Sequence, residues 1–296
     1  MKYAAAVDIG GTHTRVAIIN ENYEIENKVQ FPTTVNDPKP TIDKICQAVE
    51  NANVIGIGLS CPGPLDLKKG LVLTPPNLHA NWHGLPIVQI LQKQAGKPAY
   101  LENDANLAAY GEAILGLGKG FDIVQYLTIS TGLGAGLVIN KKIFQGSHGF
   151  ANEVANTILL PNGPSHGDII PGGIEALCSG TGIESRAKKA GLNVNHAGQV
   201  NGLAKQGNSV AMQIMQEAKE LLANYLAGIQ AYIDPDIIIL GGSVALKIDG
   251  FVEEVEQLTK QKVYPILAPY VNIKKSVLHD DAGLLGAACL CFGENQ

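Results

Sequence analysis

The chain has few of the features that mark membrane, disulfide-bonded and nucleic-acid-binding proteins. Its longest apolar runs, residues 237–240 and 284–292, are too short to span a bilayer. Its five cysteines are an odd number without a Cys-x-x-Cys pair, which favours a reducing compartment over a disulfide framework. The net charge is −5 and no basic stripe occurs, so binding to a phosphate backbone is disfavoured. We therefore expect a cytoplasmic protein that binds neither membrane nor nucleic acid.

Glycine, in contrast, is abundant. The chain has 34 glycines among 296 residues, and 46% of it is hydrophobic. This composition fits a compact α/β enzyme with many tight turns, and the length suggests one or two domains. The first strand is expected to begin at once, which leaves no room for a signal peptide or an N-terminal helix-turn-helix module.

The hydrophobic pattern predicts two similar halves, each a degenerate copy of a βββαβα unit. In the first half we expect strands at 4–8, 15–20, 24–31, 54–59 and 98–101, and helices at 40–51 and 104–116. In the second half we expect strands at 123–130, 135–140 and 236–240, and helices at 208–233 and 250–263. The small N-terminal lobe would be residues 1–115, completed by a C-terminal helix at 282–296, and the larger lobe residues 116–281.

Two glycine-rich loops, one in each half, each follow an apolar strand. The first is Asp8-Ile9-Gly10-Gly11-Thr12-His13-Thr14, and the second is Ser130-Thr131-Gly132-Leu133-Gly134-Ala135-Gly136. Glycine lets the backbone approach a ligand closely, and a concave row of backbone N–H groups is an anion seat. The hydroxyls of Thr12, Thr14 and Thr131 could add donors. Two such hairpins facing each other could hold a nucleotide triphosphate, which argues for phosphoryl transfer.

Other interpretations of the glycines are less consistent with the sequence. One isolated loop of this kind would be an ordinary hairpin turn. A dinucleotide-binding loop needs a third glycine at another spacing than Gly136, and it needs a following helix, whereas a strand is predicted here. The chain contains no Gly-x-x-x-x-Gly-Lys-Ser/Thr stretch, since Gly118-Lys119 is followed by Gly120. A Rossmann or Walker site is therefore unfavoured.

Two aspartates occupy positions suited to phosphoryl transfer. Asp8 ends a buried strand at the first loop, where a carboxylate would hold Mg²⁺ through water beside the phosphates; the alternative is an aspartate bonded to its own turn. Asp104 lies in the first turn of a helix that Asn103 or Glu102 would cap. The helix dipole keeps such a carboxylate ionised and able to accept a proton from a hydroxyl; the alternative is a plain helix cap.

With these motifs the chain resembles the ROK (repressor, open reading frame, kinase) family of sugar kinases. The resemblance implies an α/β, two-lobed, actin-like (ribonuclease-H-like) ATPase fold with the nucleotide in the cleft between the halves. The matching motifs occur in order along the chain, at residues 8–12, 60–64, 77–82, 102–106, 131–136, 152–153, 173–180 and 241–243.

By this resemblance Asp104 is the catalytic base, and the two glycine loops hold ATP. The implied ATP-binding residues are Asp8, Gly10, Gly11, Thr12, Thr14, Thr131, Gly132, Gly134, Gly241 and Gly242. Sugar hydroxyls would be bound by Asn77, Asn103, Asp104, Glu153 and Glu175, with Asn156 in the pocket wall. The family also implies a homodimer.

The chain departs from the family at a structural zinc site. Many members hold zinc with one histidine and three cysteines, but here Asn156 and Gly173 occupy two of those positions, and residues 160–171 contain no cysteine. Four soft ligands cannot be assembled, so we expect no structural zinc. Because the family histidine also touches the sugar near its anomeric carbon, Asn156 could leave room for a substituent on O1, as in cellobiose.

The function expected from these observations is an ATP- and Mg²⁺-dependent kinase for the 6-hydroxyl of glucose or a β-glucoside. An N-acetylmannosamine kinase is the first alternative and a fructokinase the next. A sugar-sensing regulator is the non-enzymatic alternative, although regulators tend to lose catalytic residues and Asp104 is intact. Actin-like polymerising or chaperone ATPases share such loops but give no reason for the polar set around Asn103, Glu153 and Glu175.

Overall fold

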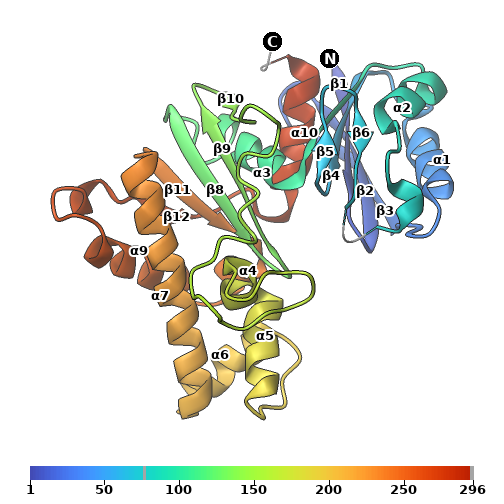
Figure 1. The fold of residues 1–296 in the computed structure, drawn as a ribbon. Coiled ribbons are helices and arrows are strands. Elements are labelled where there is room, and N and C mark those ends of the chain that lie inside the picture. The colour runs from blue at the N-terminus through green and yellow to red at the C-terminus, as the bar shows by residue number, and fades with distance from the viewer. Residues whose placement is uncertain (76–77, 294–296) are drawn as a thin grey trace. The chain divides into compact units, whose positions relative to one another are not determined.

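The computed structural model describes residues 1–75 and 78–293. The chain forms two compact units of similar internal contact density (Figure 1). The first unit consists of Met1–Lys119, Lys141–Ala151 and Asp280–Gln296, and the second of Gly120–Asn140 and Asn152–His279. The boundary that the sequence suggested, at 115–116, lies inside the first unit. The chain also enters that unit a second time at Lys141, which the sequence pattern did not reveal.

The first unit is built on a five-stranded sheet of order β3-β2-β1-β4-β7. β1 pairs antiparallel with β2 and parallel with β4, and β4 pairs parallel with β7. The strands are β1 (Tyr3–Ile9), β2 (His13–Asn20), β3 (Ile25–Pro32), β4 (Val54–Cys61) and β7 (Ala99–Asn103), and a small ribbon joins β5 (Leu65–Asp66) to β6 (Leu71–Val72).

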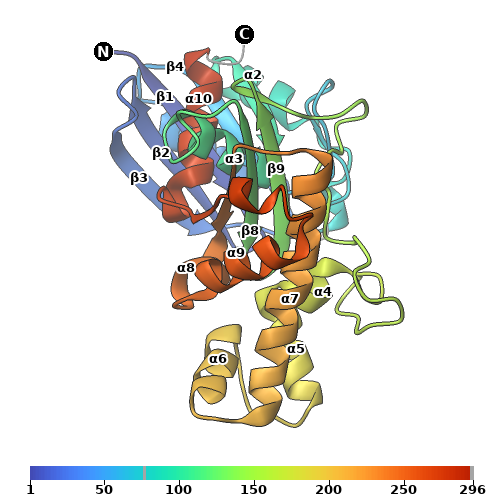
Figure 2. The same ribbon diagram turned by 90° about the vertical axis from the view of Figure 1, so that its left-hand side faces the viewer.

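Helices cover both faces of this sheet. α1 (Pro38–Val49) and α2 (Ile87–Ala95) share one apolar cluster with the sheet, which also contains the fully buried Trp82. α3 (Asp104–Ile114) and α10 (Ala282–Phe292) share the cluster on the other face and lie side by side (Figures 1 and 2). The C-terminal helix therefore belongs to the core of the first unit.

In the second unit four strands run in the order β9-β8-β11-β12. They are β8 (Ile123–Ile129), β9 (Leu133–Ile139), β11 (Ile237–Gly241) and β12 (Ile273–Lys275). One large apolar cluster joins the sheet to helices α4 (Ile174–Cys178), α5 (Gly180–Lys189), α6 (Ala197–Lys205), α7 (Ser209–Tyr232), α8 (Gly242–Lys247) and α9 (Phe251–Lys262). α5 and α6 pack beside the long α7 (Figure 2).

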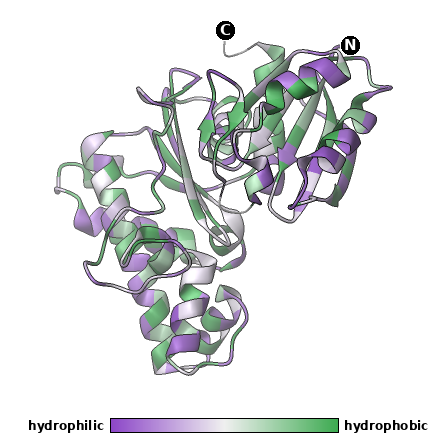
Figure 3. Ribbon diagram, turned by 45° about the vertical axis from the view of Figure 1, so that its right-hand side comes forward, coloured by the Kyte–Doolittle hydropathy of each residue, from purple (hydrophilic) through white to green (hydrophobic). Residues whose placement is uncertain are grey.

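The two sheets repeat one topology. In each, an antiparallel hairpin is followed by two parallel strands, since β8 pairs antiparallel with β9 and parallel with β11, which pairs parallel with β12. The strands of both sheets carry long hydrophobic stretches (Figure 3). Ligands of such sheets bind at the carboxyl ends of the parallel strands, so each unit offers one edge for a site.

The described residues add two observations on composition. No helix among them combines the length and apolar character needed to cross a membrane. Cys61, Cys178, Cys289 and Cys291 are buried thiols without a disulfide, as expected for core residues.

Candidate active site

The carboxyl ends of β1, β4 and β7 bring the predicted residues of the first unit to one edge. Asp8 lies beside Ser60, and Cys61 beside Asn103, in the strand registers. Burial raises the pKa of the Cys61 thiol, and the negative charges of Asp104 and Asp8 raise it further. Both aspartates therefore act on the same small region at the end of β4.

Asp8 is held by two neighbouring strands rather than by its own turn. Its Oδ1 accepts a hydrogen bond from Ser60 Oγ at 2.8 Å, and its Oδ2 accepts from Arg15 Nη2 at 2.7 Å and Nε at 3.1 Å. The Asp8 side chain is 19% exposed. A metal bound directly would displace these bonds, whereas the remaining lone pairs can accept from a metal-bound water. The geometry thus fits the water-mediated Mg²⁺ contact that the sequence suggested.

The first glycine loop has three residues, Gly10 to Thr12, between β1 and β2. Gly10 N donates to His13 O at 2.9 Å, which closes the turn. The N–H groups of Gly11 and Thr12 donate to no acceptor within the part of the chain that the structure describes. Thr12 is exposed. Two successive unbonded N–H groups form the kind of concavity that binds an anion.

Thr14 corrects one expectation from the sequence. Its side chain is fully buried, and its hydroxyl lies 2.8 Å from that of Thr33, which donates to Gly10 O at 2.7 Å. Because the Thr33 hydrogen is used on Gly10, the Thr14 hydrogen is used on Thr33. Thr14 therefore supports the loop from below and has no hydrogen for a phosphate.

Asn103 and Asp104 begin α3. Asn103 Oδ1 caps the helix by accepting from Ala105 N at 2.9 Å and Asn106 N at 3.3 Å. Its amide nitrogen donates to no described residue and remains a donor for a ligand. Asp104 is exposed, and its Oδ1 accepts from Ala105 N at 2.8 Å. The cap and the helix dipole both favour the ionised form of this carboxylate.

The second glycine loop again has three residues, Ser130 to Thr131 to Gly132, between β8 and β9. The start of α5 holds its carbonyls, since Gly180 N donates to Ser130 O at 2.7 Å and Thr181 Oγ1 donates to Thr131 O at 2.5 Å. The N–H groups of Thr131 and Gly132 have no acceptor among the described residues. This loop therefore presents the same pair of unbonded donors as the first.

Glu175 lies directly against this loop. It is in the first turn of α4, and its Oε2 accepts from Leu133 N at 2.9 Å. A Cβ built on Gly132 would lie 2.7 Å from that oxygen, so a larger residue there would displace the Glu175 carboxylate. Glu175 thus positions the loop with one oxygen and keeps Oε1 for a ligand, while Gly134 continues into β9.

Glu153 and Asn156 lie at the start of the long segment before α4. Glu153 is on the surface, makes no side-chain hydrogen bond to the described residues, and its pKa is raised by loss of water around it. Asn156 Oδ1 accepts from Ile170 N at 2.7 Å, which ties the two ends of the segment together. Its amide hydrogens remain available, so Asn156 can donate to a ligand.

The turn at Gly241 and Gly242 follows β11 and begins α8. Gly242 has φ +82°, and a Cβ there would lie 2.5 Å from Ile129 O. The turn therefore packs its backbone directly against the end of β8, beside the second loop. Ser243 Oγ lies 3.4 Å from Ser130 Oγ.

Two further expectations concern Asn77 and the absence of a structural zinc. Asn77 lies outside the described residues. In residues 1–75 and 78–293, no group of three or more His, Cys, Asp and Glu side chains could hold a metal ion.

Comparison with known proteins identifies the family of the chain. A profile of the ROK family matches residues 4–294. The chain belongs to the ROK family. The glucokinase of Thermotoga maritima is 31% identical, over 96% of this chain and 95% of the relative. The N-acetylmannosamine kinase of Salmonella heidelberg is 30% identical, over 98% of both chains.

A solved structure extends the comparison to the fold. The ROK glucokinase from Streptomyces griseus, in complex with glucose and AMPPNP, superimposes with a TM-score of 0.81 at 28% identity, over 97% of this chain and 98% of that chain. The two-lobed actin-like fold with duplicated βββαβα halves is thereby confirmed, as is the resemblance to ROK sugar kinases.

The sequence did not reveal several residues that hold the site of this ROK protein. Arg15 faces Asp8 across the first hairpin, and Thr181 pins the second loop. The hairpin register decides this contact: Ile9 pairs with Thr14, so four residues lie between the paired ends and Arg15 comes opposite Asp8. Nothing local could have suggested Thr181, which is 50 residues from its partner.

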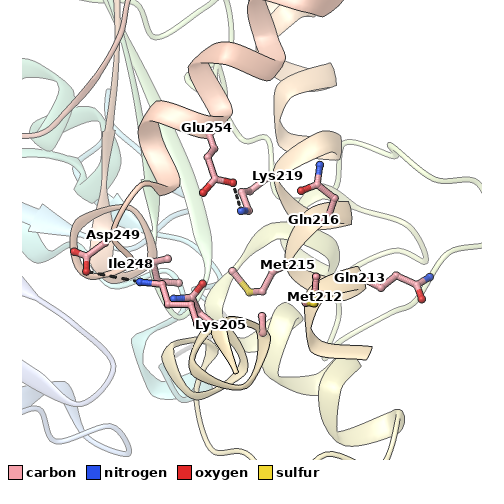
Figure 4. Close-up of a pocket in the computed structure, with 11 residues that line it drawn as sticks. Lys205, Met212, Gln213, Met215, Gln216, Lys219, Ile248, Asp249 and Glu254 are labelled. Carbon is pink, nitrogen blue, oxygen red and sulfur yellow. Dashed lines mark hydrogen bonds and ion pairs between the residues drawn. The ribbon is translucent and has the colours of Figure 1, made fainter. Parts of the chain in front are cut away.

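A surface pocket of about 430 Å³ lies in the second unit, away from the predicted site residues (Figure 4). α6, α7 and the start of α9 line it, with Met212 and Met215 on α7 and two ion pairs, Lys205–Asp249 and Lys219–Glu254. None of the residues predicted for ATP or sugar lines this pocket.

Proposed function

We propose that this protein transfers the γ-phosphoryl group of ATP to the 6-hydroxyl of a glucose-type sugar. Its family and its two named kinase relatives make it a sugar kinase, a phosphotransferase with an alcohol acceptor. The single observation that carries the proposal is that both glycine loops offer two successive unbonded N–H groups while Asp104 begins α3 at the edge of the first loop's sheet.

In this mechanism the two loops bind phosphate oxygens through Gly11, Thr12, Thr131 and Gly132. The attacking hydroxyl gives its proton to the Asp104 carboxylate, and the Asn103 amide donates to the same sugar. A strong base is not required, because the transition state is loose and catalysis comes from positioning and charge neutralisation. Gly241 and Gly242 would lie on the adenosine side.

Magnesium fits one position in this scheme. Asp8 would hold it through water, because both carboxylate oxygens already accept hydrogen bonds from Ser60 and Arg15. When bound, Mg²⁺ neutralises phosphate charge. Among the described residues no group of three or more His, Cys, Asp and Glu side chains could hold a metal ion, so phosphate oxygens and water would supply most of its ligands.

The sugar would be held by Asn77, Asn103, Glu153 and Glu175. Paired donors and acceptors suit a polyol, because each ring hydroxyl can donate and accept. Asn156 offers its amide hydrogens, while its carbonyl oxygen already accepts from Ile170 N. A hydrogen-bond donor suits the glycosidic oxygen of a β-glucoside, because this oxygen accepts but cannot donate. Glucose and β-glucosides such as cellobiose are therefore the leading substrates.

The same amide favours a second candidate, N-acetylmannosamine. The carbonyl oxygen of its acetamide group accepts hydrogen bonds only, as a glycosidic oxygen does. The relative from Salmonella heidelberg is nearly as similar as the glucokinase. Fructose, which has neither group, is a weaker candidate.

A coupled ATP-consumption assay tests these assignments. Glucose, cellobiose, N-acetylmannosamine, fructose and mannose are compared by kcat/KM, with and without Mg²⁺, and the product is analysed for phosphate on O6. We expect glucose or cellobiose to lead. Turnover of none of the five would refute the proposal, and would favour a sugar-sensing regulator if a sugar still binds.

We also propose a homodimer in the cytoplasm. The second unit exposes Tyr232, Tyr264, Ile266 and Tyr270, with exposed fractions between 67% and 93%. Tyr264, Ile266 and Tyr270 belong to one short segment, and exposed apolar residues mark an interaction surface where they form a contiguous patch. Sedimentation analysis at several concentrations tests the oligomeric state, and a monomer at all of them would contradict it.

A further inference from the structure

The chain makes an excursion at Lys141–Ala151. This segment belongs to the first unit, yet its neighbours in sequence, Asn140 and Asn152, belong to the second. It contains β10 (Lys142–Ile143), which contacts α3, and Ile143 packs against the apolar cluster that includes Leu107 of α3. The excursion thus lies along the helix that begins with Asp104.

Lys141 holds the far end of this helix. Its Nζ donates to Ala113 O at 2.9 Å, Gly118 O at 3.0 Å and Lys119 O at 2.8 Å. The last carbonyls of a helix lack partners inside the helix, and a cation there interacts favourably with its dipole. The C-terminal end of α3 is therefore fixed to the excursion.

Gln145 holds the near end through a buried carboxylate. Gln145 Nε2 donates to Glu102 Oε2 at 2.6 Å, and Glu102 is 2% exposed. The other oxygen of Glu102 accepts from Asn103 N at 2.8 Å and Asn106 Nδ2 at 3.0 Å. One carboxylate thus joins the excursion to the residue before Asp104 and to the first turn of α3.

Burying a carboxylate such as that of Glu102 costs free energy of folding. Burial raises the pKa of Glu102 even though three hydrogen bonds to it act in the opposite direction. An apolar residue would avoid this cost and pack equally well. An apolar residue could not form directional hydrogen bonds to Gln145, Asn103 and Asn106. These hydrogen bonds fix the rotation of the first turn of α3.

We propose that Glu102 and Gln145 are a positioning pair, which sets the orientation of Asp104 for the transfer step. Neither touches the reacting atoms in this scheme; they act through Asn103 and the first turn of α3. The proposal rests on the proposed function for the role of Asp104. It predicts that breaking the pair lowers kcat more than it raises KM for the sugar.

The pair can be tested by exchanging donor and acceptor. In Gln145→Glu two carboxylates face each other. We expect kcat to fall at least tenfold, because a general base that is poorly positioned loses part of its contribution to the rate, while KM for the sugar should change less than threefold. In the double variant Glu102→Gln with Gln145→Glu, donor and acceptor are reversed, and kcat should return to within about threefold of the wild type. Gln145→Ala, which removes the donor without repulsion, keeps the test valid if Gln145→Glu does not fold.

A matched exchange serves as the control. Gln216 Nε2 donates to Glu220 Oε1 at 2.8 Å, in an exposed pair on α7. Gln216→Glu with Glu220→Gln should leave kcat unchanged, and melting temperatures of all variants are recorded. A double variant no more active than Gln145→Glu, or single variants that keep full kcat, would overturn the pair.

Asp104→Asn separates failure of the pair from failure of the proposed function. If the wild type phosphorylates a sugar and Asp104→Asn does not, an absence of rescue counts against the pair alone. If Asp104→Asn keeps normal turnover, the assignment of Asp104 fails and the positioning role of the pair fails with it.

Discussion

The two units have the same strand topology at their first hairpins but different loop lengths and different side chains. In the first unit Asp8 on β1 faces Arg15 on β2 and Ser60 on β4. At the matching positions of the second unit, Thr128 on β8 faces Gly134 on β9 and Gly241 on β11. Four residues separate the paired Ile9 and Thr14 in the first hairpin and three separate Ile129 and Leu133 in the second, yet both loops have two successive unbonded N–H groups among the described residues.

The side chains at these positions suit ligand binding by the backbone in the second unit and charge-dependent chemistry in the first. The second unit has small residues at these positions, so its backbone can come close to a ligand, and it carries no charge there. The first unit has a carboxylate supported by a guanidinium and a hydroxyl, and Asp104 follows on its neighbouring edge. A duplicated fold thus repeats the two unbonded N–H groups in both copies, with Asp8 and Arg15 at the hairpin of one and Glu175 of α4 against the loop of the other.

Loss of Asp104 should have the largest effect. We expect Asp104→Asn to lower kcat by about 10²- to 10⁴-fold, the usual contribution of a positioned general base, while sugar binding changes little. Steady-state kinetics and calorimetry of sugar binding measure the two quantities. Near-normal turnover would remove Asp104 from the base role.

Gly242→Ala should come next, because it attacks the close backbone contact of the second unit. The left-handed φ costs roughly 1–2 kcal/mol for alanine, and the contact with Ile129 O adds about 1–3 kcal/mol of overpacking. Gly96→Ala is the matched control, since Gly96 has φ +64° with nothing within 4 Å of its Cβ. Thermal unfolding should show a larger loss at Gly242, together with a raised KM for ATP. Equal losses at both glycines would show that the contact has no cost.

Asp8→Asn should weaken the response to magnesium. Outer-sphere partners of a metal contribute about 10- to 100-fold to its affinity, so the Mg²⁺ concentration for half-maximal rate should rise by that factor. Thr128→Val, the matching position of the second unit, should leave the Mg²⁺ titration unchanged. A shift of similar size in both variants would contradict the division between the units.

The smallest effect is expected for Ser60→Ala. It removes one hydrogen bond to Asp8, worth about 0.5–1.5 kcal/mol. The Mg²⁺ titration should therefore shift by about 2- to 10-fold, in the same direction as in Asp8→Asn. An effect as large as that of Asp8→Asn would mean that Ser60 contacts the ligand itself.

The sequence predicted the local elements well and the long-range partners poorly. The strand expected at 54–59 continues to Cys61, and the helix expected at 104–116 ends at Ile114. These errors are at the ends of elements, where hydrophobic periodicity fades. Thr14 was assigned to phosphate because it follows a glycine turn, but side chains alternate along a strand, and its face points into the core.

Glycine spacing, buried strands and helix caps act over a few residues, so the amino-acid order alone determined both loops, the start of α3 at Asp104 and the duplicated topology. The tertiary structure alone decided that Arg15 and Ser60 support Asp8, that Thr181 pins the second loop, and that Gln145 reaches Glu102. These contacts join residues on separate strands and segments, and their geometry exists only after the chain has packed. Local propensity fixes which backbone shapes form, and packing fixes which charges meet.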